Sequence, residues 1–266
     1  MSQQSNPYTD AELQRALEYI KERLSIQAEA RDRLADSLYI AALKLIKLSR
    51  KYMETSRDFS FSMNKELEKN VDAIIEELED ELYSLTETYG SKGAEKETKK
   101  VILLYIASKI FGKTLKQRLP SYGKMFKTEI ENLIASASVT KTSYNSVVSA
   151  AKTYVKNPKA SNIIRKAENM GFTPNEYNVE GAIKISYGNI ERVVIDTIAR
   201  ARQKMYQIEE KEMHGTNAWY VRRGSSYPCS LCDMQTGIHK SDFELPPYHP
   251  NCVCLAIPIK IDVPQD

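Results

Sequence analysis

The feature that most constrains this chain is a long stretch without helix breakers, because neither glycine nor proline occurs from Tyr8 through Tyr89. Thr9 and Glu12 have the spacing of a capping box, in which each side chain satisfies a free backbone amide at a helix start. We therefore predict a long helix after Thr9, a break near residues 58–60, and a second helix antiparallel to the first. Residues 1–90 would form this N-terminal helical hairpin. The apolar stripe of the second helix is Val71, Ile74, Ile75, Leu78, Leu82 and Leu85.

Further helices are predicted as far as residue 217, which makes residues 91–217 a second helical domain. Residues 101–107 are apolar on nearly all sides, as is typical of a buried core helix. Pro120 and Gly123 are expected to interrupt the next stretch, with helices following at 124–137, 142–156 and 160–169. A long helix over about 188–212 has the apolar stripe Ile190, Val194, Ile198, Ala201 and Met205. Its basic side chains are expected on solvated faces: Arg192, Arg200, Arg202 and Lys204.

All four cysteines lie between Cys229 and Cys254, and together with His249 they have the spacing C-x2-C-x16-H-x2-C-x-C. Glycine and proline are frequent in this part of the chain, and aliphatic residues are few, so burial alone would hold it together poorly. Clustered thiols in a chain without an export signal indicate metal binding before disulfides, which need an oxidising compartment. Residues 218–266 are therefore predicted to form a zinc-binding C-terminal module.

Zinc in a structural site takes four ligands in a tetrahedron, and two ligands separated by two residues can occupy adjacent corners. Cys229 and Cys232 form one such pair, and His249 and Cys252 form another. Cys254 is a fifth candidate, because on an extended strand it would face the same side as Cys252. We predict one structural zinc with four of these five residues as ligands, and the sequence leaves open which of His249, Cys252 and Cys254 is not a ligand. The predicted fold class is thus mainly α, with an elongated helical body and a small zinc-stapled loop and β module.

A filled zinc site keeps no position open for substrate, and little else in the module suggests catalysis. The other polar candidates for acid or base work are His239, Asp233, Asp242 and Glu244, and none is paired with a nucleophile in the sequence. We therefore expect no enzymatic activity.

The C-terminal motifs resemble a known family. A strand-like Trp219-Tyr220-Val221, the C-x-x-C pair, Gly237, and the run from Pro246 to Cys254 resemble the C-terminal module of phage Mu F-like minor head proteins, also called head-morphogenesis proteins. The preceding helix at 188–212 fits the same pattern. Val253 stands where the family usually has arginine, and residues 222–226 lack the aspartate that often precedes the first cysteine.

This resemblance implies a low-copy virion component, made in the host cytoplasm and placed in the procapsid interior or at the portal vertex. Its partners would be the portal and/or the major capsid or scaffold protein. No apolar run reaches the roughly 18 residues of a membrane helix, so no membrane contact is expected.

Two other functions remain open on the sequence. Residues 92–170 contain 16 basic and 5 acidic side chains, so this segment could contact DNA phosphates as part of a DNA-binding module. An HNH-type nuclease also has C-x-x-C pairs, but it needs a catalytic histidine beside a metal-binding one. Here no two of His214, His239 and His249 are adjacent.

Overall fold

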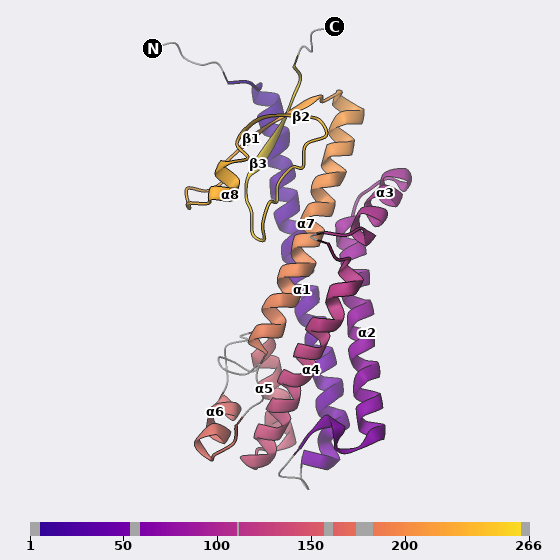
Figure 1. The fold of residues 1–266 in the computed structure, drawn as a ribbon, viewed down its shortest axis with the longest axis vertical. Helices are drawn as coiled ribbons and strands as arrows, with labels where there is room; N and C mark the ends of the chain where they lie inside the picture. The colour runs from indigo at the N-terminus through magenta and orange to yellow at the C-terminus, as the bar shows by residue number, and fades with distance from the viewer. Residues whose placement is uncertain (1–5, 54–58, 111, 157–161, 174–182, 262–266) are drawn as a thin grey trace. The chain divides into compact units, whose positions relative to one another are not determined.

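The computed structural model describes residues 6–53, 59–110, 112–156, 162–173 and 183–261. Over these residues the fold is mainly helical with a small C-terminal antiparallel sheet (Figure 1), which confirms the predicted fold class. The helices are α1 (Asp10–Met53), the 3-10 turn η1 (Phe61–Met63), α2 (Lys65–Gly90), α3 (Lys96–Ala107), α4 (Leu115–Val139), α5 (Tyr144–Lys156), α6 (Asn162–Asn169), α7 (Lys184–His214) and the short α8 (Ser230–Asp233). The strands are β1 (Ala218–Arg222), β2 (Gly237–Lys240) and β3 (Leu255–Ile259).

Residues that contact one another group into two compact units, each made of several chain segments. The first contains Met1–Ala30, Thr86–Ala107 and Ile195–Asp266, and the second contains Arg31–Leu85 and Ser108–Val194. Because α1, α2 and α7 each contribute to both units, these groups do not follow the segments 1–90, 91–217 and 218–266. The three-domain division therefore stays a prediction.

The start of α1 follows the predicted capping box. The Thr9 amide donates to Glu12 Oε2 at 2.7 Å, and the Glu12 amide donates back to Thr9 Oγ1 at 3.3 Å. The helix then runs without interruption to Met53. Asp58, part of the expected break, lies outside the described residues.

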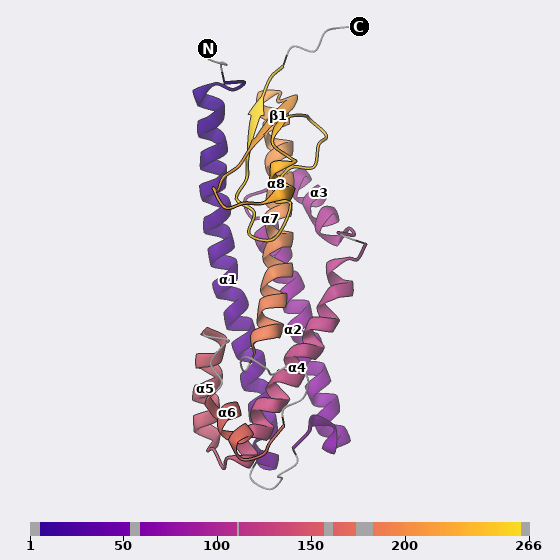
Figure 2. The same ribbon diagram turned by 60° about the vertical axis from the view of Figure 1, so that its left-hand side comes forward.

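Within the second unit, α1 and α2 are antiparallel, as the sequence predicted. Ser37 Oγ donates to Glu81 at 2.7 Å and Lys44 Nζ donates to Glu77 at 2.6 Å, so residue numbers rise along one helix as they fall along the other. Most of the predicted stripe of α2 is buried, namely Val71, Ile75, Leu78, Leu82 and Leu85. Figure 2 shows the two helices from a second direction.

The prediction that Pro120 and Gly123 interrupt the chain was wrong, because α4 runs through both. A capping box starts this helix: the Gln117 amide donates to Thr114 Oγ1 at 3.2 Å, and the Thr114 amide donates to Gln117 Oε1 at 2.9 Å. Pro120 lies in the second turn and removes only one backbone bond. At Gly123 a Cβ atom would overlap the Glu79 carboxylate, so glycine permits α4 to approach α2 closely.

Two predictions for the first unit need correction. In α3, Ile102 and Ile106 are buried, but Val101 is 45% exposed and Leu104 is 73% exposed, so this helix buries one side rather than all sides. In α7 the apolar stripe is buried as predicted, but Arg200 and Arg202 are not solvated. Arg202 is only 1% exposed.

Both arginines of α7 have acidic partners within the first unit. Arg200 Nε lies 2.9 Å from the Asp196 carboxylate, and its Nη1 lies 3.1 Å from Glu244. Arg202 Nη2 lies 2.5 Å from Glu22 Oε1, and its Nη1 donates to the carbonyl of Lys92. These ion pairs account for the burial of two basic side chains that composition alone assigns to the surface.

The C-terminal sheet has the order β2-β1-β3, with both pairs antiparallel. Trp219 in the central strand is 1% exposed and lies 5.7 Å, between ring centroids, from Tyr206 of α7. Tyr206 stacks in turn on Tyr19 of α1 at 4.1 Å. The sheet therefore shares a core with α1 and α7, and Figure 2 shows these three parts of the first unit together.

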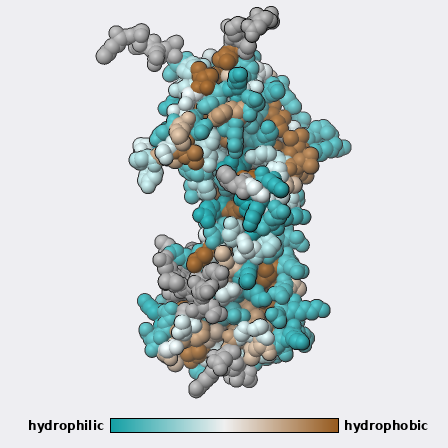
Figure 3. All heavy atoms as spheres, in the orientation of Figure 1, coloured by the Kyte–Doolittle hydropathy of each residue, from teal (hydrophilic) through white to brown (hydrophobic). Residues whose placement is uncertain are grey.

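Across the described residues, no helix combines the length and apolarity that crossing a bilayer requires. Hydrophilic side chains make up most of the face shown in Figure 3, where apolar side chains form separate groups.

Candidate metal centre

The structure brings together all five predicted metal ligands, from α8 and the loops around the sheet. Their ligand atoms form two groups of three, each within 4.8 Å, and Cys232 belongs to both. The first group adds Cys229 and His249, and the second adds Cys252 and Cys254. This cluster could hold a metal ion such as zinc.

Three distances between donor atoms lie within about 0.5 Å of those in a tetrahedral zinc site. Usual Zn–S and Zn–N bond lengths place two sulfurs about 3.8 Å apart, and a sulfur about 3.5 Å from a nitrogen. Cys232 Sγ lies 3.8 Å from Cys252 Sγ. His249 Nε2 lies 3.0 Å from Cys232 Sγ and 3.3 Å from Cys229 Sγ. The residues present therefore fit zinc, and the four cysteines are free thiols rather than disulfides.

The imidazole of His249 is oriented by its second nitrogen. Nδ1 lies 2.9 Å from the carbonyl oxygen of Pro250, so Nδ1 carries the proton and donates. The lone pair of Nε2 then points toward the two sulfurs. This is the arrangement by which a second contact fixes the ligating tautomer of a histidine.

The turn from Cys229 to Cys232 favours the thiolate form of Cys229. The backbone N–H of Cys232 donates to Cys229 Sγ, and this is the main reason that the pKa of the Cys229 thiol is lowered. The thiol of Cys232 and the backbone N–H of Leu231 add to the effect. Burial instead raises the pKa of the Cys232 and Cys254 thiols, a cost that a bound cation would offset.

Gly224, which follows β1, lies directly against the backbone of Val253 and Cys254. Its backbone N–H donates to the sulfur of Cys254, and a Cβ at Gly224 would overlap the carbonyl oxygen of Val253. Only glycine permits this close approach. The next loop is held by Arg223, whose guanidinium contacts the Asp233 carboxylate and the Tyr227 carbonyl.

One contact to the site comes from a residue that the sequence analysis did not consider. Arg23 of α1 donates from Nη2 to the carbonyl oxygen of Cys252 at 3.3 Å. The two residues lie far apart in the sequence, and no local pattern links them.

The other polar candidates lie elsewhere. His239 stacks on Phe243 with ring centroids 3.7 Å apart, and its Nε2 lies 2.9 Å from the carbonyl of Gln235. Asp233 and Glu244 are occupied in ion pairs with arginine, and Asp242 is exposed. Among the described residues, none of these four belongs to a metal-binding group.

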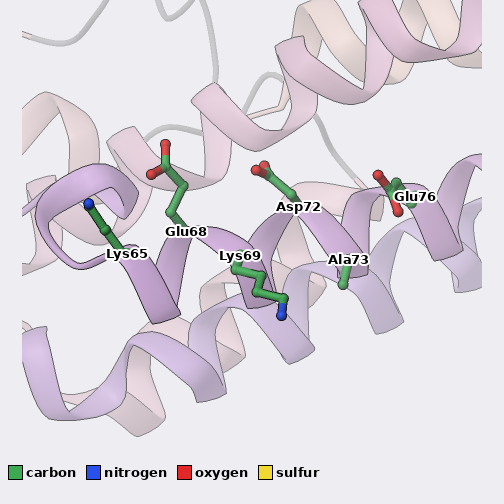
Figure 4. Close-up of a pocket in the computed structure, with 6 residues that line it drawn as sticks. All are labelled: Lys65, Glu68, Lys69, Asp72, Ala73 and Glu76. Atoms are coloured by element: carbon green, nitrogen blue, oxygen red, sulfur yellow. The ribbon is translucent and has the colours of Figure 1, made fainter.

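A second candidate is a hollow on α2 in the other unit, shown in Figure 4. In that view the carboxylates of Glu68 and Asp72 point the same way, as residues four apart on a helix do. Asp72 pairs with Lys127 of α4 at 2.6 Å. These are charged groups on a helix surface, and within the described ranges they form no group suited to a metal.

No protein-family model matches this chain, and neither a curated protein nor a solved structure matches it. Fold and site thus define a mainly helical protein whose small C-terminal sheet lies beside a Cys/His cluster able to hold a metal ion.

Proposed function

We propose that the cluster is one structural zinc site and that the chain is a minor head protein of a tailed phage, without enzymatic activity. The observation that carries the zinc assignment is that Cys232 belongs to both groups of donors, with His249 Nε2 at 3.0 Å and Cys252 Sγ at 3.8 Å from its sulfur. The phage assignment is supported by the motif from Trp219 to Cys254, which resembles the minor head proteins. In this role zinc stabilises the C-terminal loops, and other surfaces contact the portal, capsid or scaffold protein.

Four of the five donors are assigned as ligands. Cys229, Cys232 and His249 form one group with two sulfur-to-nitrogen distances close to those of a zinc site. Cys252 is the fourth, because its sulfur lies at the tetrahedral spacing from Cys232. Cys254 is then a neighbouring thiol that accepts the Gly224 amide.

Metal analysis under reducing conditions tests the site directly. Protein purified without chelator should contain about one equivalent of zinc. Cys252→Ser should lose most of it, Cys254→Ser should retain it, and His239→Ala should match the wild type as a control. A metal content well below one equivalent, with all thiols freely titratable, would refute the zinc assignment.

The virion assignment needs the particle or its components. The protein should copurify with the portal when the two are expressed together, and cryo-electron microscopy of heads should place it at low copy near the portal vertex. Heads that assemble, package DNA and infect normally without this protein would count against the proposal.

DNA binding is the second candidate, favoured by the excess of basic residues between 92 and 170. Some of these lysines are engaged with carboxylates, as Lys92 is with Glu29 and Lys127 with Asp72. A gel-shift series at increasing salt distinguishes the candidates, because phosphate-driven binding weakens steeply with salt. A nuclease assay with Mg²⁺ or Mn²⁺ tests the absence of catalysis, and cleavage that disappears in His239→Ala would overturn it.

A further inference from the structure

We propose that Arg23 of α1 is the buried counter-charge of the metal–thiolate cluster, and that it couples this helix to metal binding. The inference rests on the proposed zinc site, and it assigns a positioning role to a residue outside the ligand motif. Its basis is one juxtaposition: a buried guanidinium without a carboxylate, directly against the backbone of a ligand.

Arg23 is 1% exposed, and the hydrogen bond from Nη2 to the Cys252 carbonyl is the contact that ties it to the C-terminal loops. Its Nε and Nη1 atoms have no hydrogen-bond partner. Its guanidinium carbon lies 5.7 Å from the centre of the Tyr19 ring, which offsets only part of the cost of burying a charge. Among the described residues, no carboxylate lies within ion-pair distance of Arg23.

The other buried arginines of this unit are treated differently. Arg202 is equally buried, but it has the Glu22 carboxylate at 2.5 Å. Arg200 has Asp196 at 2.9 Å. A buried cation is strongly destabilising when it lacks an opposite charge, so Arg23 needs an anion that no acidic side chain supplies.

The metal cluster supplies that anion. Zinc carries two positive charges, and three thiolates with one neutral imidazole leave the centre with a single negative charge. The guanidinium of Arg23 neutralises this charge from the Cys252 side. Without the metal, the described residues offer Arg23 a backbone carbonyl in place of an anion, so the burial of its charge is uncompensated.

Arg23→Met tests this coupling in the full-length protein. The substitution keeps an unbranched side chain and removes the charge. We expect zinc affinity, measured by competition with a chromogenic chelator, to fall about 10- to 100-fold, the usual effect of losing a contact that orients a metal ligand. In the zinc-loaded protein the melting temperature should fall, whereas in the chelator-treated protein it should be unchanged or higher.

Arg202→Met is the matched control, because this arginine is as deeply buried but has its own carboxylate. It should lower the melting temperature in both metal states and leave zinc affinity within about threefold of the wild type. If Arg23→Met does not fold, the pair Arg23→Lys and Arg23→Gln replaces it. Arg23→Lys keeps the positive charge, so this variant should bind zinc more tightly than Arg23→Gln does.

Equal zinc affinity in the wild type and Arg23→Met would overturn the inference while leaving the zinc site intact. An equal fall in melting temperature with and without zinc would also overturn it, because a purely structural arginine behaves in that way. Equal affinity of the lysine and glutamine variants has the same consequence. A wild type that binds no zinc would instead refute the proposed site itself.

Discussion

Glu129 of α4 provides the sharpest test of the energetics of the second unit. Its carboxylate is fully buried and accepts hydrogen bonds at the start of α7, from the Ile185 amide at 3.0 Å, the Ser186 amide at 3.2 Å and the Ser186 hydroxyl. Burial raises the pKa of Glu129 from 4.5 to about 7, although these donors lower it. The effect of burial on the pKa is the larger one, because three hydrogen-bond donors replace only part of the hydration that the carboxylate loses.

The direction of the resulting pH dependence follows from linkage. A carboxyl whose pKa is higher in the folded state binds its proton more tightly there, so its stabilising contribution is complete below about pH 4.5 and is lost as pH rises through 7. One pKa unit corresponds to about 1.4 kcal/mol, so ionisation of Glu129 costs roughly 2 to 3 kcal/mol between pH 5 and pH 8. Glu129→Gln removes this ionisation.

The assay is urea unfolding of the wild type and Glu129→Gln at pH 5, 6.5 and 8, with the helical signal as the probe. The free energy of unfolding of the variant, relative to that of the wild type, should rise by about 2 kcal/mol between pH 5 and pH 8. This change does not depend on the constant cost of the substitution itself. Ser186→Ala removes a donor that lowers the pKa of Glu129, so in this variant the folded-state pKa should be higher still. The loss of stability should then extend to higher pH and be larger at pH 8, whereas the pH at which it begins is set by the unfolded carboxyl and should not change. A stability difference between the wild type and Glu129→Gln that is the same at all three pH values would refute the reasoning.

Three further predictions concern the C-terminal module, and a glycine of α7 provides the control for one of them. Cys229→Ser should abolish zinc binding and, because structural zinc contributes on the order of 10 kcal/mol to such modules, abolish order in the surrounding loops, as hydrogen exchange would show. Gly224→Ala should destabilise the module by about 2 kcal/mol or more in thermal unfolding, since its Cβ would overlap the Val253 carbonyl. Gly188→Ala, in α7 with no atom within 4 Å of the new Cβ, should instead be stabilising by about 0.5–1 kcal/mol. Trp219→Ala should cost about 3–5 kcal/mol by calorimetry, because this side chain is 1% exposed in the core shared with α1 and α7.

The helices that the sequence predicts well are those whose own spacing carries the information. Val71 to Leu85 and Ile190 to Met205 repeat at helical intervals, and these residues are mostly buried as expected. The ligands were predictable for a similar reason. Short spacings such as that of Cys229 and Cys232 are set by local backbone geometry, which sequence records directly.

Two of the errors, at α3 and α7, have one physical source, which is contact with distant parts of the chain. Leu104 is an apolar residue of α3, but no other part of the described chain covers its side of the helix, so it remains exposed. Arg202 is buried because Glu22 is present to pair with it. The start of α4 is a different case, because the spacing of Thr114 and Gln117 is a capping box that outweighs Pro120 as a local signal.

Two separate stabilising effects meet in the C-terminal module. The sheet is held by burial, since Trp219 and Val221 of β1 pack with Tyr19 and Tyr206, and none of these contacts needs a metal. The loops between Gly224 and Cys254 add Leu245, Phe243 and Tyr248 to that core. Under the proposed zinc site, the segments that carry the cysteines and His249 are expected to depend on the bound metal as well. Arg23 connects the two, because α1 carries both Tyr19 in the core and the guanidinium that contacts Cys252. Removing the metal should therefore release the loops first, and only loss of the aromatic core should detach the sheet from α1 and α7.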